Sequence, residues 1–209
     1  WLPVIESEID YGGTSEVYKL GSNAGEPSDV SPALRFNNSI SLPLAFRHGN
    51  FSTYLKGSVS SNYINRYIYL KEKNAYDYGQ TELTTRVYLS HYSQSGIRRI
   101  YPKWALIMDY LYTYFPFDKS IYGTMSTLRT ALYIPGLLRN HGLRLRYESD
   151  YQRPEKLILY NRANFPRGYD NIISEDLKLF SADYVMPLAY PDLNIPAFLY
   201  VKRIRGGLF

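Results

Sequence analysis

The chain has 209 residues and a formal net charge of +5; 45% of its residues are hydrophobic, 23 are tyrosine and none is cysteine. The lack of cysteine excludes a disulfide framework and any thiolate metal site. Lysine and arginine are interleaved with acidic residues and form no dense basic run, which argues against nucleic-acid binding.

The sequence shows neither a signal peptide nor a transmembrane helix. The first residues, Trp1, Leu2 and Pro3, lack the basic start and apolar core of a signal peptide. No uncharged apolar stretch reaches the roughly 18 residues of a transmembrane helix. The mean hydropathy of −0.33 suits a soluble all-β protein. It also suits a transmembrane barrel, whose strands alternate lipid-facing apolar with lumen-facing polar residues. We expect either a signal upstream of this segment or a cytosolic protein.

Period-two alternation of apolar and polar residues recurs along the chain and predicts an all-β, antiparallel fold. Between residues 33 and 47, one face carries Leu34, Phe36, Ile40, Leu42, Leu44 and Phe46. Between residues 101 and 115, one face carries Trp104, Leu106, Met108, Tyr110, Tyr112 and Tyr114, and Asp109 points the other way. Between residues 143 and 152, Leu143, Leu145, Tyr147 and Tyr151 oppose a polar face of Arg144, Arg146, Glu148, Asp150 and Gln152. Such a polar face suits a wet lumen or solvent, and its opposite charges can pair across strands.

Nine strands are predicted, at residues 1–11, 33–46, 50–69, 81–93, 100–115, 121–134, 142–153, 176–187 and 197–209. The third is too long to be uninterrupted, so we expect a bulge at Gly57 or Ser60–Ser61, or a projection beyond the membrane.

The connections alternate between short and long. Residues 47–49, 94–96 and 138–142 are predicted to be tight turns, whereas the segments near 19–32, 70–80 and 154–175 are longer and rich in Gly, Pro, Asn and Asp. Short turns on one side and long loops on the other are the pattern of bacterial outer-membrane barrels. The three prolines between Pro187 and Pro196 predict a further turn on the short side.

An odd number of strands is awkward for a complete barrel, because bacterial single-chain barrels have an even number and open edges are not tolerated in hydrocarbon. The last predicted strand also runs to the final residue, Phe209. We therefore expect the segment to be part of a larger barrel.

A motif near the C-terminus supplies a resemblance. Arg167-Gly168-Tyr169 precedes a strand that carries Asp183 four residues before Pro187, and a strand reading Arg203-Ile204-Arg205-Gly206-Gly207-Leu208-Phe209 follows. This order resembles the C-terminal barrel of the BamA/TamA superfamily, also called bacterial surface antigens. Pro166 departs from the aliphatic residue that usually precedes the arginine in that family.

The resemblance implies a sixteen-stranded barrel in the outer membrane of a Gram-negative bacterium. Residues 142–153 would correspond to its eleventh strand. The segment 154–175 would fold inward, and Arg167 would pair with Asp183. A charge-assisted pair of this kind would brace the barrel, because breaking it leaves a buried charge. Further lumen charges are expected at Arg203, Arg205, Arg144, Arg146, Glu148 and Asp150.

The implied function is insertion or translocation of other outer-membrane proteins. It would act by strand templating, without bond chemistry. The implied partners are outer-membrane lipid, unfolded outer-membrane protein clients, and accessory lipoproteins or other complex subunits, with no nucleic acid and no cofactor.

Three alternatives stay open. The barrel could be an accessory or structural member of an outer-membrane complex. A soluble β-sandwich could bind carbohydrate through its tyrosines. A barrel enzyme would need Ser90 and His91, but no acidic partner stands out. The remaining histidines, His48 and His141, are scattered, and no metal-ligand cluster is seen.

Overall fold

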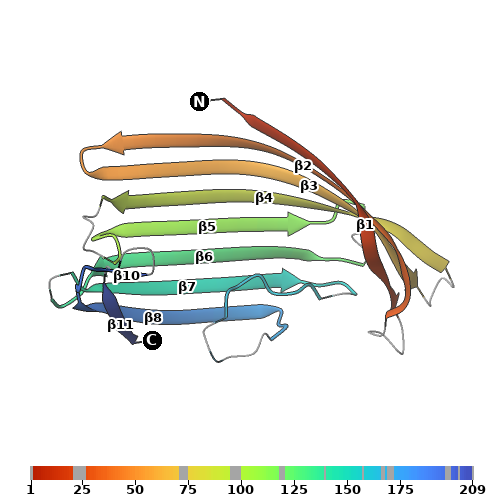
Figure 1. Ribbon diagram of the computed structural model, residues 1–209. Helices are drawn as coiled ribbons and strands as arrows, with labels where there is room; N and C mark the ends of the chain where they lie inside the picture. The colour runs from red at the N-terminus through yellow and green to blue at the C-terminus, as the bar shows by residue number, and fades with distance from the viewer. Residues whose placement is uncertain are drawn as a thin grey trace.

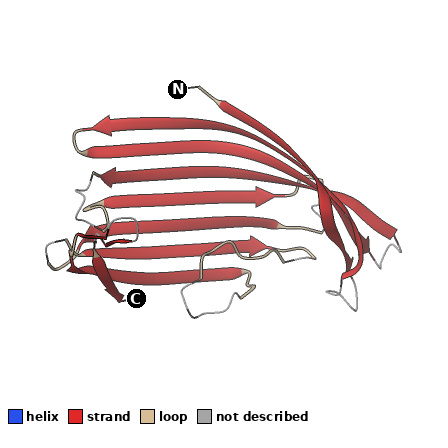
Figure 2. Ribbon diagram, in the orientation of Figure 1, coloured by secondary structure: helices blue, strands red, loops and turns tan. Residues whose placement is uncertain are grey.

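A computed structural model of the protein describes residues 2–20, 27–70, 75–94, 100–117, 121–138, 140–156, 158–165, 168, 172–195, 199–201 and 203–208. In these ranges the protein is all-β, and its main sheet is antiparallel between neighbouring strands (Figure 2). The predicted all-β antiparallel class is thereby confirmed. The part of the chain that is described contains no helix of the length and apolarity needed to cross a membrane.

The strands are β1 (Val4–Leu20), β2 (Pro27–His48), β3 (Phe51–Leu70), β4 (Ala75–Ser93), β5 (Ala105–Tyr114), β6 (Thr124–Pro135), β7 (Gly142–Arg153), β8 (Asp176–Ala189), β9 (Leu193–Ile195), β10 (Leu199–Val201) and β11 (Ile204–Leu208). Within the described residues, β1 to β8 follow one another in a curved nine-stranded sheet that ends in β11 (Figure 1). Its edge strands, β1 and β11, do not pair, so the sheet is not closed over these residues.

The first four strands are long. β1, β2 and β4 extend into the regions predicted as long connections at 19–32 and 70–80. The pairing of β1 with β2 ends at Tyr18 and Pro27. There the last residues of β1 pair in parallel with the end of β3, from Tyr18–Ile68 to Leu20–Leu70. β3 is a single strand whose register shifts between Ile64 and Tyr67, not at the sites expected for its bulge. Gly57 pairs with Leu42 on β2 and with Val87 on β4, and the register is regular there.

The connections at one end of the sheet differ in length. β2 and β3 are joined by a two-residue turn, with Gly49 at φ +55°, a backbone region that favours glycine. Pro135 pairs with Gly142, so a short loop joins β6 and β7. β4 ends at Ser93 and β5 begins only at Ala105, where the Ser93 N–H bonds the Trp104 carbonyl (2.8 Å), so the connection between these strands is longer than predicted. Residues 95 and 96 of the tight turn predicted at 94–96 lie outside the described residues.

The C-terminal region departs most from expectation. The predicted strand 197–209 is divided, since β10 pairs with the short β9 while β11 pairs with β8. β8 runs through Pro187, which was expected to start a turn. A proline fits there because pairing with β7 has ended at Val185 and the β11 register shifts beside it, so no regular ladder bond needs its missing N–H.

The two faces of the sheet have inverted polarity. We call the face that carries segment 158–165 the inner face and the opposite one the outer face. Buried polar residues of the inner face are Ser41, Gln80, Ser90, Asp109, Thr113, Thr127, Glu148, Asp150 and Gln152. Exposed apolar residues of the outer face include Ile40, Val59, Val87, Met108, Tyr110, Leu132, Tyr147 and Phe180. A water-soluble domain places these classes the other way round.

Candidate functional site

Segment 158–165, which follows β7, returns over the inner face and is held there by buried carboxylates (Figure 1). Asp150 Oδ2 accepts the backbone N–H of Arg162 (2.7 Å) and of Ala163 (2.8 Å). Glu148 Oε2 accepts the next backbone N–H, that of Asn164 (2.6 Å). Three consecutive N–H groups thus meet two carboxylates, and such charge-assisted bonds offset part of the cost of burying the charge.

Gln152, two residues after Asp150 on β7, also binds the inward segment. Its side-chain amide donates to the Leu159 carbonyl (2.9 Å) and accepts from the Leu159 N–H (3.0 Å). Residues 148, 150 and 152 are two apart on one strand, so their side chains share a face. The polar face predicted for residues 143–152 is therefore the docking surface for the inward segment. We name Glu148, Asp150 and Gln152 the β7 row.

The side chain of Arg162 links the segment to more distant strands. It contacts Glu82 Oε1 on β4 (2.6 Å) and Thr113 Oγ1 on β5 (2.9 Å). Its backbone carbonyl accepts a bond from Arg129 on β6, and its N–H reaches Asp150 on β7. One residue therefore connects four neighbouring strands through the inner face. The sequence reasoning missed Arg162, because its acidic partner lies 80 positions away.

A second charge cluster lies on the same face. Arg86 forms a two-point contact with Asp109, from Nε (2.6 Å) and from one terminal nitrogen (2.9 Å), and Arg129 approaches the same carboxylate to 3.8 Å. The side chain of Asp109 is only 9% exposed. Two arginines around one buried carboxylate tie β4, β5 and β6 together.

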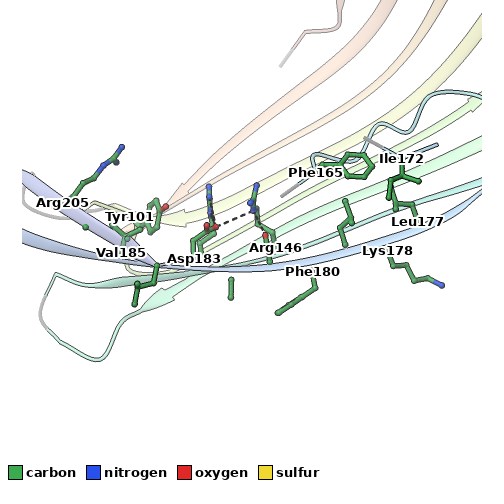
Figure 3. A pocket seen from close by; sticks show the side chains of 17 residues that line it. Tyr101, Arg146, Phe165, Ile172, Leu177, Lys178, Phe180, Asp183, Val185 and Arg205 are labelled. Atoms are coloured by element: carbon green, nitrogen blue, oxygen red, sulfur yellow. Dashed lines mark hydrogen bonds and ion pairs between the residues drawn. The ribbon is translucent and has the colours of Figure 1, made fainter. Parts of the chain in front are cut away.

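Asp183 lies opposite Arg144 in the β7–β8 register. Its Oδ2 receives Arg144 through Nε (2.9 Å) and a terminal nitrogen (2.8 Å), with Arg146 3.7 Å away (Figure 3). Arg167 and Tyr169 lie outside the described residues, and Gly168 has φ +85°. The Arg167–Asp183 pair therefore stays a prediction. Among the described residues Oδ1 of Asp183 accepts no hydrogen bond. This oxygen is therefore available as an acceptor for Arg167.

The other predicted lumen charges are placed as follows. Arg205 lines the same groove as Asp183, Arg144 and Arg146. Arg203 lies between β10 and β11. Leu199 and Val201, which were expected to share its strand, belong to the separate β9–β10 pair.

The residues considered for an enzyme do not converge. Ser90 and His91 are consecutive in β4 and therefore point to opposite faces. His91 lies on the outer face, stacked on Phe51 with ring centroids 5.0 Å apart, and its Nδ1 is 2.8 Å from Thr53 Oγ1. Over the described ranges, no group of three or more His, Asp or Glu side chains is placed to hold a metal ion.

No protein-family model matches the chain, and neither does any curated protein or solved structure. The resemblance to the surface-antigen barrels therefore rests on the motif at residues 167–169, on Asp183 and on the strand that follows.

Proposed function

We propose that this segment forms part of the wall of a transmembrane β-barrel in the outer membrane of a Gram-negative bacterium. The observation that carries the proposal is the inverted polarity of the sheet, with carboxylates buried on one face and apolar side chains exposed on the other. Apolar patches of this extent mark membrane or protein contacts. A barrel wall needs that arrangement, with lipid outside and polar groups inside.

Strand length supports the same proposal. β5 has 10 residues, β6 and β7 have 12 each, and β8 has 14. A tilted strand needs about 9–11 residues to cross the hydrocarbon layer. Strands β2 to β4 are longer than this. They would project beyond the membrane at the end of the sheet where β1 also pairs with β3.

The proposed role is insertion or translocation of other outer-membrane proteins by strand templating, as the resemblance implies. The inward segment would brace the wall from inside, through the β7 row and Arg162. The partners would be lipid at the outer face, unfolded client proteins, and accessory lipoproteins or other subunits of a complex.

Membrane contact can be tested with single cysteines, because the chain has none of its own. Val59 is 53% exposed on the outer face and Ser58 is its inner-face neighbour. A fluorophore on Val59→Cys should be quenched by brominated lipid at least about fivefold more strongly than one on Ser58→Cys, because adjacent strand residues point to opposite faces. Aqueous iodide should reverse the order. Equal quenching of both sites by iodide alone would contradict the membrane proposal.

The assembly role needs a separate test. Liposomes carrying the full-length protein should fold a urea-denatured outer-membrane barrel faster than protein-free liposomes, followed by the gel shift of the folded client. No acceleration, with lipid contact at Val59 retained, would exclude the assembly role and favour an accessory barrel.

A further inference from the structure

Three buried polar atoms beneath segment 158–165 have no hydrogen-bond partner among the described residues. They are Thr127 Oγ1 and Arg129 Nε on β6 and Asp150 Oδ1 on β7. Thr127 is 1% exposed and Asp150 is 0% exposed, so both are closed to bulk solvent. The Arg129 side chain is 29% exposed, but its Nε is buried. Buried polar atoms in folded proteins are nearly always paired, so a cluster of three points to a bound partner.

The three atoms belong to one place in the fold. Thr127 and Asp150 are direct partners in the β6–β7 register, and directly opposed residues have Cβ atoms about 4.5–5.5 Å apart. Arg129 lies two residues after Thr127 and therefore shares its face. The backbone of Arg162 joins the two charged groups, because its N–H bonds Asp150 Oδ2 (2.7 Å) and its carbonyl accepts from a terminal nitrogen of Arg129. The guanidinium and the carboxylate thus meet at one residue of the inward segment.

The other contacts of these side chains hold them in place. Asp150 Oδ2 accepts two backbone N–H groups, which fixes the carboxylate. The terminal nitrogens of Arg129 bond the Arg162 carbonyl and approach Asp109 to 3.8 Å, which fixes the guanidinium. Thr127 is β-branched and has few χ1 rotamers available. Asp150 and Arg129 therefore cannot turn toward each other without giving up contacts that anchor the segment.

The chemistry of the three atoms selects the kind of partner. An ionised carboxylate oxygen only accepts hydrogen bonds, the Arg129 Nε only donates, and the Thr127 hydroxyl does both. A cation would suit Asp150 but would be repelled by the guanidinium, and an anion would meet the opposite conflict. A neutral molecule that donates and accepts suits all three atoms. Because Thr127 and Asp150 are fully enclosed, the molecule must also be small. Water has these properties.

We propose that one ordered water molecule binds between β6 and β7 beneath segment 158–165. It accepts from Arg129 Nε, donates to Asp150 Oδ1 and shares a hydrogen bond with Thr127 Oγ1. A buried water typically makes about three such bonds, and a bridging water is nearly as favourable in enthalpy as a direct bond. The water connects the β7 row to β6, so that two strands anchor the inward segment. This site is independent of the proposed role in assembly, because it involves only the wall and its own segment.

Thr127→Val tests the water site through the sign of its effect. Valine keeps the branched shape and removes the hydroxyl. If that hydroxyl holds the water, its loss loosens the segment, whereas replacing an unpaired buried hydroxyl by an apolar group is neutral or stabilising. Opening can be read in the full-length protein in micelles from maleimide labelling of Ala163→Cys, a site that is 7% exposed. Thr127→Val should raise the labelling rate about fivefold, as expected for one lost hydrogen bond.

Two variants serve as controls. Thr127→Ser keeps the hydroxyl and should change the labelling rate by less than about twofold. Thr130→Val removes a hydroxyl from the outer face of the same strand, where it donates to the Tyr147 carbonyl (3.0 Å), and should also stay within about twofold. Unchanged or slower labelling in Thr127→Val, or an equal increase in Thr130→Val, would overturn the water site.

A crystal structure of the full-length protein separates water from other partners of the hydroxyl. We expect one density peak at about 2.5–3.2 Å from Thr127 Oγ1, Arg129 Nε and Asp150 Oδ1. A direct bond between Thr127 and Asp150, a metal ion with contacts at about 2.0–2.6 Å, or no peak where neighbouring waters are visible would each overturn the site. Lipid contact at Val59 and client folding would be unaffected, so the proposed function would still stand.

Discussion

Replacing Asp150 by alanine should lower the free energy of unfolding by about 3 kcal/mol, which is among the largest single-residue effects expected in this sheet. Asp150 is fully buried, and one of its oxygens accepts two backbone N–H groups. Leaving a buried donor without an acceptor costs about 1–3 kcal/mol. The other oxygen, Oδ1, is buried with no partner among the described residues. Two donors lose their acceptor, a loss of about 2–6 kcal/mol. Removing Oδ1 relieves part of the cost of burying the charge, so the net loss lies in the lower half of that range.

The measurement is urea unfolding of the full-length protein in micelles, together with the temperature at which the folded band disappears from a gel. Asp150→Asn should fall between wild type and Asp150→Ala, because the amide oxygen still accepts both N–H groups without the charge. Asp176→Asn is the control, since Asp176 is 53% exposed and, within the described ranges, its side chain bonds only Lys178. It should change stability by less than about 0.5 kcal/mol. An Asp150→Ala variant as stable as this control would show that the β7 row does not hold the inward segment.

The pattern of residues 143–152 shows what the sequence could predict. Alternation is a local property, so it predicts both the strand and the face on which each side chain lies. β7 spans Gly142–Arg153, the range predicted for it. Its polar face also holds the predicted lumen charges Glu148 and Asp150. Their function in binding the backbone of segment 158–165 was not predicted, because nothing in a strand pattern says which loop covers it.

Long-range and irregular features were not predictable in the same way. Arg162 was not singled out, because the alternation pattern gives no register between a loop residue and Glu82 on β4. The division of residues 197–209 into β10 and β11 also escaped prediction. It depends on tertiary contacts that the local pattern does not contain. Tyr200 donates to Asp192 (2.6 Å), and Arg205 of β11 lies opposite Pro187 of β8. Proline statistics alone predicted a turn at Pro187, and the end of the β7 ladder overrode them.

Arg162→Gln should release the inward segment without unfolding the sheet. The substitution removes the charge on the contact with Glu82, a pair whose side chains are 29% and 21% exposed. Glu82 keeps a bond from Thr84 Oγ1 (3.0 Å), so it is not left without a donor. Charge-assisted hydrogen bonds contribute about 1.5–3 kcal/mol. Because local opening depends on local contacts, the cost should fall on the segment more than on global unfolding.

Local opening can be read from a cysteine placed at the neighbouring residue, Ala163, which is 7% exposed. In the Ala163→Cys background, Arg162→Gln should raise the rate of maleimide labelling by at least about tenfold, because 1.4 kcal/mol changes an opening equilibrium by that factor. The urea midpoint should shift much less than in Asp150→Ala. Arg153→Gln is the control, since Arg153 is exposed and its side chain bonds only Tyr151 among the residues that the structure describes. Unchanged labelling in Arg162→Gln would mean that the β7 row alone holds the segment. A large loss of global stability would mean that Arg162 stabilises the sheet itself.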